Sequence, residues 1–97
     1  MNLPEPDKKK IIDICRANEV MFCGVFGSFA RGEGDESSDV DLLVRFRNPV
    51  GWEFYGIADD LENALGRKVD LATDRMLRKS IRDTVMRDLQ VIYEEAE

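Results

Sequence analysis

The order of apolar and polar positions along the chain predicts alternating short helices and strands. Apolar runs at residues 20–26 and 40–46 are long enough to form buried strands, and residues 68–72 predict a third, shorter one. Asp7 is the predicted N-cap of a first helix, because helical spacing of apolar residues follows it and ends near Asn18. The first half of the chain therefore predicts a helix followed by two strands.

The second half of the chain predicts two amphipathic helices and a last strand. Apolar residues share one face of residues 52–65, and Gly66 stands where a helix-ending glycine is expected. A four-residue apolar repeat predicts a continuous helix over 74–88, carried by Leu77, Ile81, Val85 and Leu89. Residues 90–93 predict a short edge strand, and residues 29–31 a helical turn. We expect one α+β domain over 1–97, with a small mixed sheet of three or four strands and helices packed against it.

Composition narrows the class of protein. The chain has 97 residues, of which 43% are apolar and 35% charged, a mixture typical of a soluble globular domain with one modest core. The net charge of −6 makes general nucleic-acid binding unlikely, since such binding requires a basic surface. The charge is uneven, because residues 67–87 hold seven basic and three acidic side chains. This local excess of positive charge predicts a focused partner or an anionic ligand.

Several functional classes are excluded by the residues that are absent. The chain contains no histidine, which excludes a Cys/His zinc site and a Ser-His-Asp triad. Cys15 and Cys23 are too few for a disulfide framework and are predicted to be small buried apolar residues. No apolar stretch is long enough to cross a bilayer, and no apolar segment follows Lys8–Lys10 as in a secretory signal. We therefore expect a cytoplasmic protein without a membrane partner.

Three aspartates supply the candidate chemistry. Side chains alternate between the faces of a strand, so Asp39 and Asp41 are expected to point the same way, opposite an apolar row at Val40 and Leu42. Asp70 has the same alternation on the third strand. If that strand pairs with the second, all three carboxylates converge on one patch. Two carboxylates at 4 Å repel by roughly 4 kcal/mol at an effective dielectric of 20, so the cluster calls for a proton or a hard cation such as Mg²⁺, Mn²⁺ or Ca²⁺.

A Gly-Ser turn supplies a candidate phosphate site beside them. Gly27 and Ser28 directly follow the first predicted strand and open a helical turn. Glycine allows close backbone approach to a ligand, and the amides of a helix start together with the Ser28 hydroxyl are donors for an anion. The combination of this turn with an Asp-x-Asp on the next strand predicts a site for a nucleoside triphosphate.

These residues resemble a known family. Gly27-Ser28, ten residues and then Asp39-Val-Asp41 form the pattern G-S-x10-D-x-D, within the segment GSFARGEGDESSDVDLLV. The segment resembles the nucleotidyltransferases typified by DNA polymerase beta, and the small size is similar to the minimal nucleotidyltransferase (MNT) antitoxins that pair with HEPN ribonuclease toxins. The resemblance covers roughly residues 20 to 90, and it maps the third family carboxylate onto Asp70.

The resemblance implies a reaction and a partner. It implies that two Mg²⁺ ions bind between Asp39, Asp41, Asp70 and the triphosphate of ATP, with Asp70 also helping to deprotonate the acceptor hydroxyl. Gly27, Ser28 and Arg31 are the implied nucleotide-binding residues. The implied function is an antitoxin that transfers AMP to a tyrosine hydroxyl of a HEPN toxin encoded next to it, in a hetero-oligomer with that toxin.

Alternative interpretations of these residues stay open. Asp39 and Asp41 could be solvated residues of a half-buried strand, Ser28 an N-cap, and Arg31 a solvent-facing side chain. Arg45 is expected to be an internal counter-ion rather than an ATP contact. The aromatic residues Trp52, Phe54 and Tyr55 are expected in the core or facing a partner, rather than against adenine. The basic side chains Arg75, Arg78, Lys79 and Arg82 are expected to be the solvated face of a helix, with a binding role as the alternative.

Two alternative functions also remain. One is a nucleotidyltransferase with a small-molecule or nucleic-acid acceptor. The other is an antitoxin that masks its toxin without catalysis.

Overall fold

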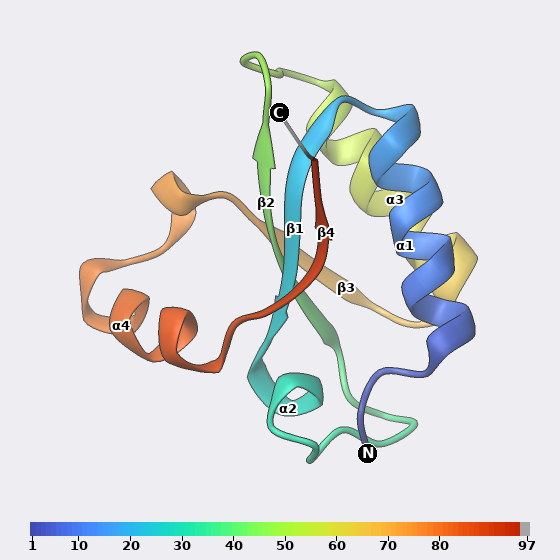
Figure 1. The fold of residues 1–97 in the computed structure, drawn as a ribbon, viewed down its shortest axis with the longest axis vertical. Coiled ribbons are helices and arrows are strands. Elements are labelled where there is room, and N and C mark those ends of the chain that lie inside the picture. Colours follow the sequence, from blue (N-terminus) through green and yellow to red (C-terminus); the bar gives the residue numbers. More distant parts are fainter. Residues whose placement is uncertain (96–97) are drawn as a thin grey trace.

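A computed structural model describes residues 1–95 of the chain (Figure 1). The helical elements are α1 (Glu5–Ala17), α2 (Gly27–Ala30), α3 (Glu53–Leu65), the 3₁₀ turn η1 (Asp74–Met76) and α4 (Lys79–Asp88). The strands are β1 (Val20–Phe26), β2 (Val40–Phe46), β3 (Val69–Ala72) and β4 (Gln90–Glu94). The predicted α+β fold is confirmed, as are the positions of the two long strands and the last edge strand. The last strand extends one residue beyond the predicted range, to Glu94, and residues 96–97 lie outside the described part.

One mixed sheet organises the fold, with strand order β3-β2-β1-β4. The strands β1 and β2 pair antiparallel, as do β1 and β4, whereas β2 and β3 run parallel. The parallel pair follows from the chain path, because α3 connects the end of β2 to the start of β3. The prediction that the third strand lies beside the second is therefore confirmed.

The two faces of the sheet are covered unequally (Figure 1). Helices α1 and α3 lie on one face, where Ile11, Ile57 and Leu61 pack on the inward side chains of β1 and β2 in the main core. On the other face, α4 and the segment before it cover a smaller cluster of four buried residues, Phe22, Leu43, Leu77 and Val85. Both cysteines are free and lie in the main core, as predicted.

Two predictions about helices were wrong. The first helix begins at Glu5, with Pro4 as the N-cap, so Asp7 lies in its first turn and caps nothing. Pro6 fits this position because a proline in the first turn has no amide hydrogen bond to lose. The predicted continuous helix over 74–88 is interrupted, since Leu77 and Arg78 have extended backbone angles between η1 and α4. Leu77 packs into the smaller cluster beside Leu43, whereas Ile81 is 47% exposed, so the four-residue repeat does not mark one buried stripe.

Within residues 1–95, no helix is both long enough and apolar enough to cross a membrane.

Candidate active site

Two of the three candidate aspartates lie side by side at the start of β2 and β3. Asp41 and Asp70 are direct neighbours in the register of the parallel strands, and their carboxyl groups lie near enough for the charge of Asp70 to raise the pKa of Asp41. Asp39 precedes β2 and lies near enough to Asp41 for their charges to repel. The strand alternation places Asp41 opposite Val40 and Leu42, which are fully buried in the main core. The expected meeting of Asp41 with Asp70 is therefore confirmed.

The surroundings of Asp41 favour the protonated form of its carboxyl group over the charged form. Burial, the nearby Asp70 and the charge of Asp39 together raise the pKa of Asp41 from 3.8 to about 6, while the charge of Arg31 opposes the rise. A group of this kind is stabilised by a proton or by a bound cation. Asp39 and Asp41 are half-buried and Asp70 is exposed, so a ligand reaches the pair from solvent.

The carboxylates of Asp41 and Asp70 are chemically suited to bind a hard cation, but the predicted arrangement of three ligands is not formed among the described residues. Carboxylate oxygens are the donors that Mg²⁺ prefers, and Asp41 and Asp70 present them side by side. In the part of the chain that the structure describes, however, no three cysteine or acidic side chains are arranged to hold a metal ion. The pair is assembled, and the joint ligation of metal by Asp39, Asp41 and Asp70 stays a prediction.

The Gly27 turn lies directly against the aspartates. Phe26, the last residue of β1, pairs with Asp41, so the chain enters α2 beside that carboxylate. Gly27 has a φ of 72°, and a Cβ atom at this position would overlap the Asp41 carboxylate. Glycine is needed here for two reasons: the left-handed backbone and the close approach of Asp41. The next residue, Ser28, is half-buried, and its hydroxyl has no hydrogen-bond partner among residues 1–95.

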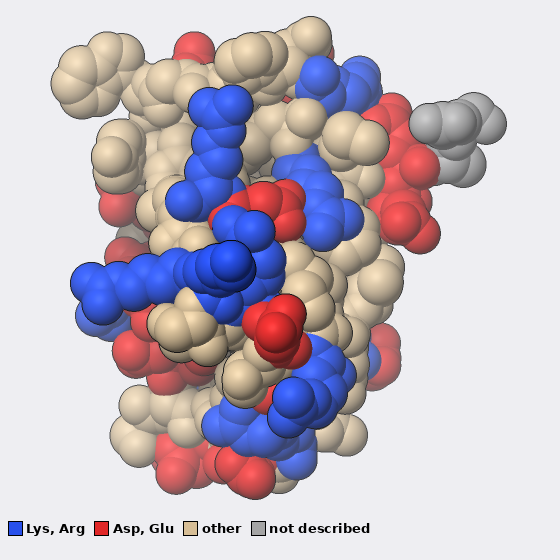
Figure 2. Space-filling model, turned by 90° about the vertical axis from the view of Figure 1, so that its left-hand side faces the viewer, with Lys and Arg blue, Asp and Glu red and all other residues tan. Residues whose placement is uncertain are grey.

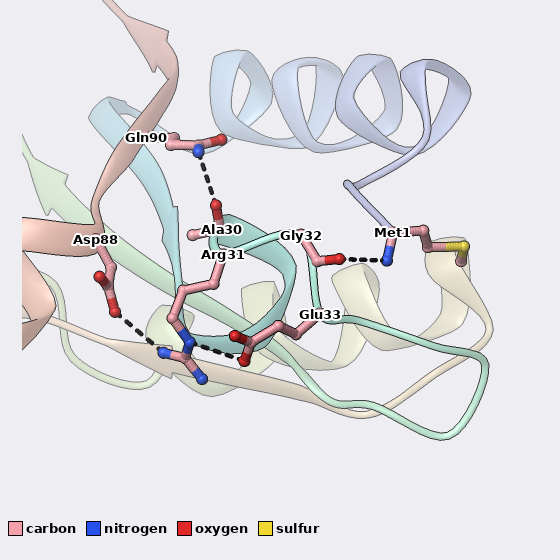
Figure 3. A network of polar contacts seen from close by, with 7 residues as sticks. All are labelled: Met1, Ala30, Arg31, Gly32, Glu33, Asp88 and Gln90. Carbon is pink, nitrogen blue, oxygen red and sulfur yellow. Dashed lines mark hydrogen bonds and ion pairs between the residues drawn. The ribbon is translucent and has the colours of Figure 1, made fainter.

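Arg31 is held beside this turn by acidic side chains (Figure 3). Its Nε donates to Glu33 at 3.1 Å, and one terminal nitrogen donates to Asp88 at 3.0 Å. The side chain is 44% exposed, and the hydrogen bonds that it donates to Glu33 and Asp88 raise its pKa. Arg31 is thus neither a lone solvent-facing residue nor tied to an aspartate of the pair. A phosphate could draw it away from Asp88.

Sequence reasoning missed the contacts that fix this turn from a distance (Figure 3). The side-chain amide of Gln90 donates to the Ala30 carbonyl at 2.7 Å, and the Met1 amino group donates to the Gly32 carbonyl at 2.7 Å. Arg67 donates to the Asp35 carbonyl at 3.0 Å and stacks over the buried Phe29 ring. These contacts join residues 31 to 60 positions apart, so no local pattern could have revealed them.

The other candidate residues lie away from the aspartate pair. Arg45 forms an ion pair with Asp74 at 2.9 Å and is thus the expected internal counter-ion, although its partner is not one of the three aspartates. Phe54 packs against the main core, whereas Trp52 and Tyr55 are 88% and 66% exposed. An open groove of about 520 Å³ lies at the opposite ends of β2 and β3 from the aspartates, between Arg45–Val50 and Thr73–Arg75. Its position separates it from the Gly27 turn.

Comparison with known proteins identifies the family. The family model "Polymerase beta, Nucleotidyltransferase" matches residues 9–97 of the chain. The chain belongs to the polymerase beta nucleotidyltransferase family. This confirms the family and the enzyme class that the Gly-Ser turn and the Asp-x-Asp pattern indicated. The match includes every residue of this nucleotidyltransferase that was predicted to bind metal or nucleotide.

Relatives narrow the comparison further. The protein adenylyltransferase MntA of Thermococcus cleftensis is 45% identical over 71 residues, which are 72% of this chain and 70% of MntA. Two solved structures share the fold of this nucleotidyltransferase. One is a toxin–antitoxin complex with AMP-PNP, with a TM-score of 0.77 and 24% identity over 90% of this chain and 73% of that one. The other is a complex of a tri-AMPylated Shewanella oneidensis HEPN toxin with an MNT antitoxin, with a TM-score of 0.70 and 22% identity over 91% and 70%.

Proposed function

We propose that this nucleotidyltransferase is an antitoxin that transfers AMP from ATP to a tyrosine hydroxyl of a HEPN toxin encoded next to it. The observation that carries the proposal is the contact of Asp41 with Asp70 beside the Gly27 turn. This juxtaposition supplies carboxylates for a cation and donors for a phosphate within one small region. The relation to MntA and the shared fold with MNT–HEPN complexes support the choice of acceptor.

The nucleotide is expected to bind with its phosphates against α2. The backbone amides after Gly27 and the unpartnered hydroxyl of Ser28 would donate to phosphate oxygens. Arg31 would leave Asp88 and pair with the triphosphate, because a doubly charged phosphate group is a stronger partner for a guanidinium than one carboxylate. Asp39, Asp41 and Asp70 would hold Mg²⁺, which neutralises phosphate charge when it is bound.

The transfer itself requires in-line displacement at the α-phosphorus. The acceptor oxygen forms a bond to that phosphorus while the bond to the pyrophosphate oxygen breaks, so that AMP is transferred and pyrophosphate leaves. Asp70 is the most exposed of these three aspartates and would accept the proton of the incoming hydroxyl. A bound cation would favour the ionised form of Asp41, whose pKa is raised to about 6 by burial and by the neighbouring carboxylates.

The test is a transfer assay with the protein encoded next to this one. The wild type is incubated with Mg²⁺, α-labelled ATP and that neighbouring protein, and the labelled residue is identified by mass spectrometry. We expect label on a tyrosine of the neighbour, and a loss of at least about 1000-fold when Asp39 and Asp41 are both changed to Asn. Asp59→Asn with Asp60→Asn, on the exposed side of α3, is the matched control that should retain full transfer.

The outcomes separate the alternatives. If the neighbouring protein is silenced without label, masking explains the antitoxin function better than catalysis. If the Asp39→Asn, Asp41→Asn variant transfers AMP at the normal rate, the assignment of the site is wrong. If label goes only to a small molecule or a nucleic acid, the acceptor assignment is wrong although the enzyme class stands.

A further inference from the structure

The exposed side of η1 and α4 carries a concentrated positive surface (Figure 2). We define the basic face as five exposed side chains of this segment: Arg75, Arg78, Lys79, Arg82 and Arg87. None of them forms an ion pair with another residue in the described range 1–95. Arg31, Arg45 and Arg47, by contrast, are all paired with carboxylates. Arg82 donates a hydrogen bond to the Asp74 carbonyl at 3.3 Å, but no carboxylate of the described residues is ion-paired with the basic face.

The basic face also exposes apolar side chains. Met76 is 57% exposed and Ile81 is 47% exposed, and both lie among the five cations. Every residue from 78 to 84 is exposed, while Leu77 and Val85 hold the segment to the sheet. Arginine and methionine are enriched in protein interfaces, where apolar contact and charge act together. The segment is anchored on one side and open on the other.

The position of the basic face links it to the candidate active site. The cluster that holds α4 includes Leu43, which lies two residues from Asp41 on the same side of β2. At the end of α4, Asp88 binds Arg31, and Gln90 of β4 binds the α2 carbonyl of Ala30 (Figure 3). A macromolecule seated on α4 would therefore lie beside the turn that is expected to hold the phosphates.

We propose that the basic face docks an acidic segment of the partner protein and so brings its acceptor hydroxyl to the aspartates. The proposal rests on the proposed function and adds to it the surface that selects the partner. Charge complementarity supports this choice of partner. The chain as a whole has a net charge of −6, but the five cations of the basic face form no ion pair among the described residues and would attract an acidic surface locally. Residues 75–88 contain no aromatic ring on which a base could stack, and the exposed Met76 and Ile81 favour a protein over RNA.

The experiment measures binding separately from transfer. Arg75→Gln, Arg78→Gln and Lys79→Gln are combined in one variant, since none of these side chains makes an ion pair within the described residues. The control for net charge combines Lys8→Gln, Lys9→Gln and Lys10→Gln on α1, on the far side of the sheet; it also removes the exposed ion pair of Lys8 with Glu5 and the hydrogen bond from Lys10 to the Ala64 carbonyl. Affinity for the purified product of the neighbouring gene is measured by calorimetry without ATP, and equal melting temperatures verify the folds.

We expect the variant of the basic face to bind at least about tenfold more weakly and to show a shallower dependence of affinity on salt. The control should stay within about twofold of the wild type. In the transfer assay, the variant should need more of the partner protein to reach half its maximal rate while the maximal rate is retained, because the aspartates are unchanged. Asp41→Asn should show the converse, with binding kept and transfer lost.

Three results would overturn the docking proposal. The first is equal affinity of wild type and variant for the partner, or no binding by the wild type. The second is a variant that binds a single-stranded poly(U) probe more weakly than the wild type but binds the partner protein with unchanged affinity. That result would make RNA the ligand of the basic face. The third is a wild type and a control that are dimers in solution while the variant of the basic face is a monomer, which would make a second copy of this chain the occupant. Binding through the basic face without any transfer by the wild type would overturn the proposed function and leave the docking surface intact.

Discussion

The two faces of the sheet divide stability from chemistry. On the face under α1 and α3, Val40, Leu42 and Val44 are at most 1% exposed and belong to one continuous core. On the other face, the same strand presents Asp41, then the buried Leu43, then Arg45, and only a small cluster is covered by Leu77 and Val85. One strand thus serves a packed interior on one side and an ionisable, solvent-reached site on the other. The second face tolerates repelling charges because the first one supplies most of the burial.

The largest effect expected from this comparison comes from matched leucine truncations. Leu42→Ala in the main core should lower the free energy of unfolding by about 3 kcal/mol, through lost burial and a cavity that the packed surroundings cannot close. Leu77→Ala in the smaller cluster should cost about 2 kcal/mol, since this cluster has only four buried residues and Leu77 lies at its edge between η1 and α4. Urea unfolding monitored by circular dichroism measures both. Equal costs would contradict the division between the faces.

Alanine substitutions at two glycines distinguish the effect of backbone strain from the effect of a collision with Asp41. Gly27 and Gly66 both have left-handed backbone angles, with φ of 72° and 68°, so alanine at either should cost about 1 kcal/mol. A new Cβ at Gly27 would collide with Asp41, whereas at Gly66 it would meet nothing within 4 Å. We expect Gly27→Ala to reduce AMP transfer at least about 100-fold and Gly66→Ala to leave it unchanged. Comparable activities would remove Gly27 from the site.

The pH dependence of stability should reveal the repulsion at the aspartate pair. The native state holds the proton of Asp41 more tightly than the unfolded chain, because its pKa is raised from 3.8 to about 6. In metal-free buffer, this group therefore destabilises the protein increasingly as pH rises through that window, with no further change above it. After allowance for solvent screening, Asp41→Asn should be more stable than wild type by about 1 kcal/mol at about pH 8, with a smaller gain at about pH 4. Thermal melts across this range provide the measurement, and a gain independent of pH would refute the explanation.

The smallest effect is expected at the ion pair of Arg45 with Asp74. Their side chains are 41% and 43% exposed, and Arg45 also stacks over the Phe22 ring at 4.6 Å. A double-mutant cycle with Arg45→Gln and Asp74→Asn should yield a coupling energy of about 0.5 kcal/mol, since solvent screens the pair. Transfer should be unaffected. A large loss of transfer in either variant would extend the active site along β2.

Local patterns of residues predicted most of this molecule. The apolar runs of β1 and β2, the glycine that ends α3 and the alternation at Asp39 and Asp41 depend on neighbours in the sequence, and all were readable there. The break at Leu77 was not, because tertiary packing of that side chain on Phe22 and Leu43 overrides its helical spacing. The partners of Arg31 and Arg45 were missed for a related reason, since Asp88 and Asp74 are distant in sequence.

The shallow anchoring of α4 has an evolutionary consequence. Only Leu77 and Val85 of this segment are buried against the sheet. The exposed residues between positions 75 and 84 can therefore change in sequence without disturbing the core. Lineages of such enzymes could acquire new recognition specificities by rewriting this short stretch while inheriting the same reaction centre, and grafting it between homologues would then be a practical route to orthogonal pairs.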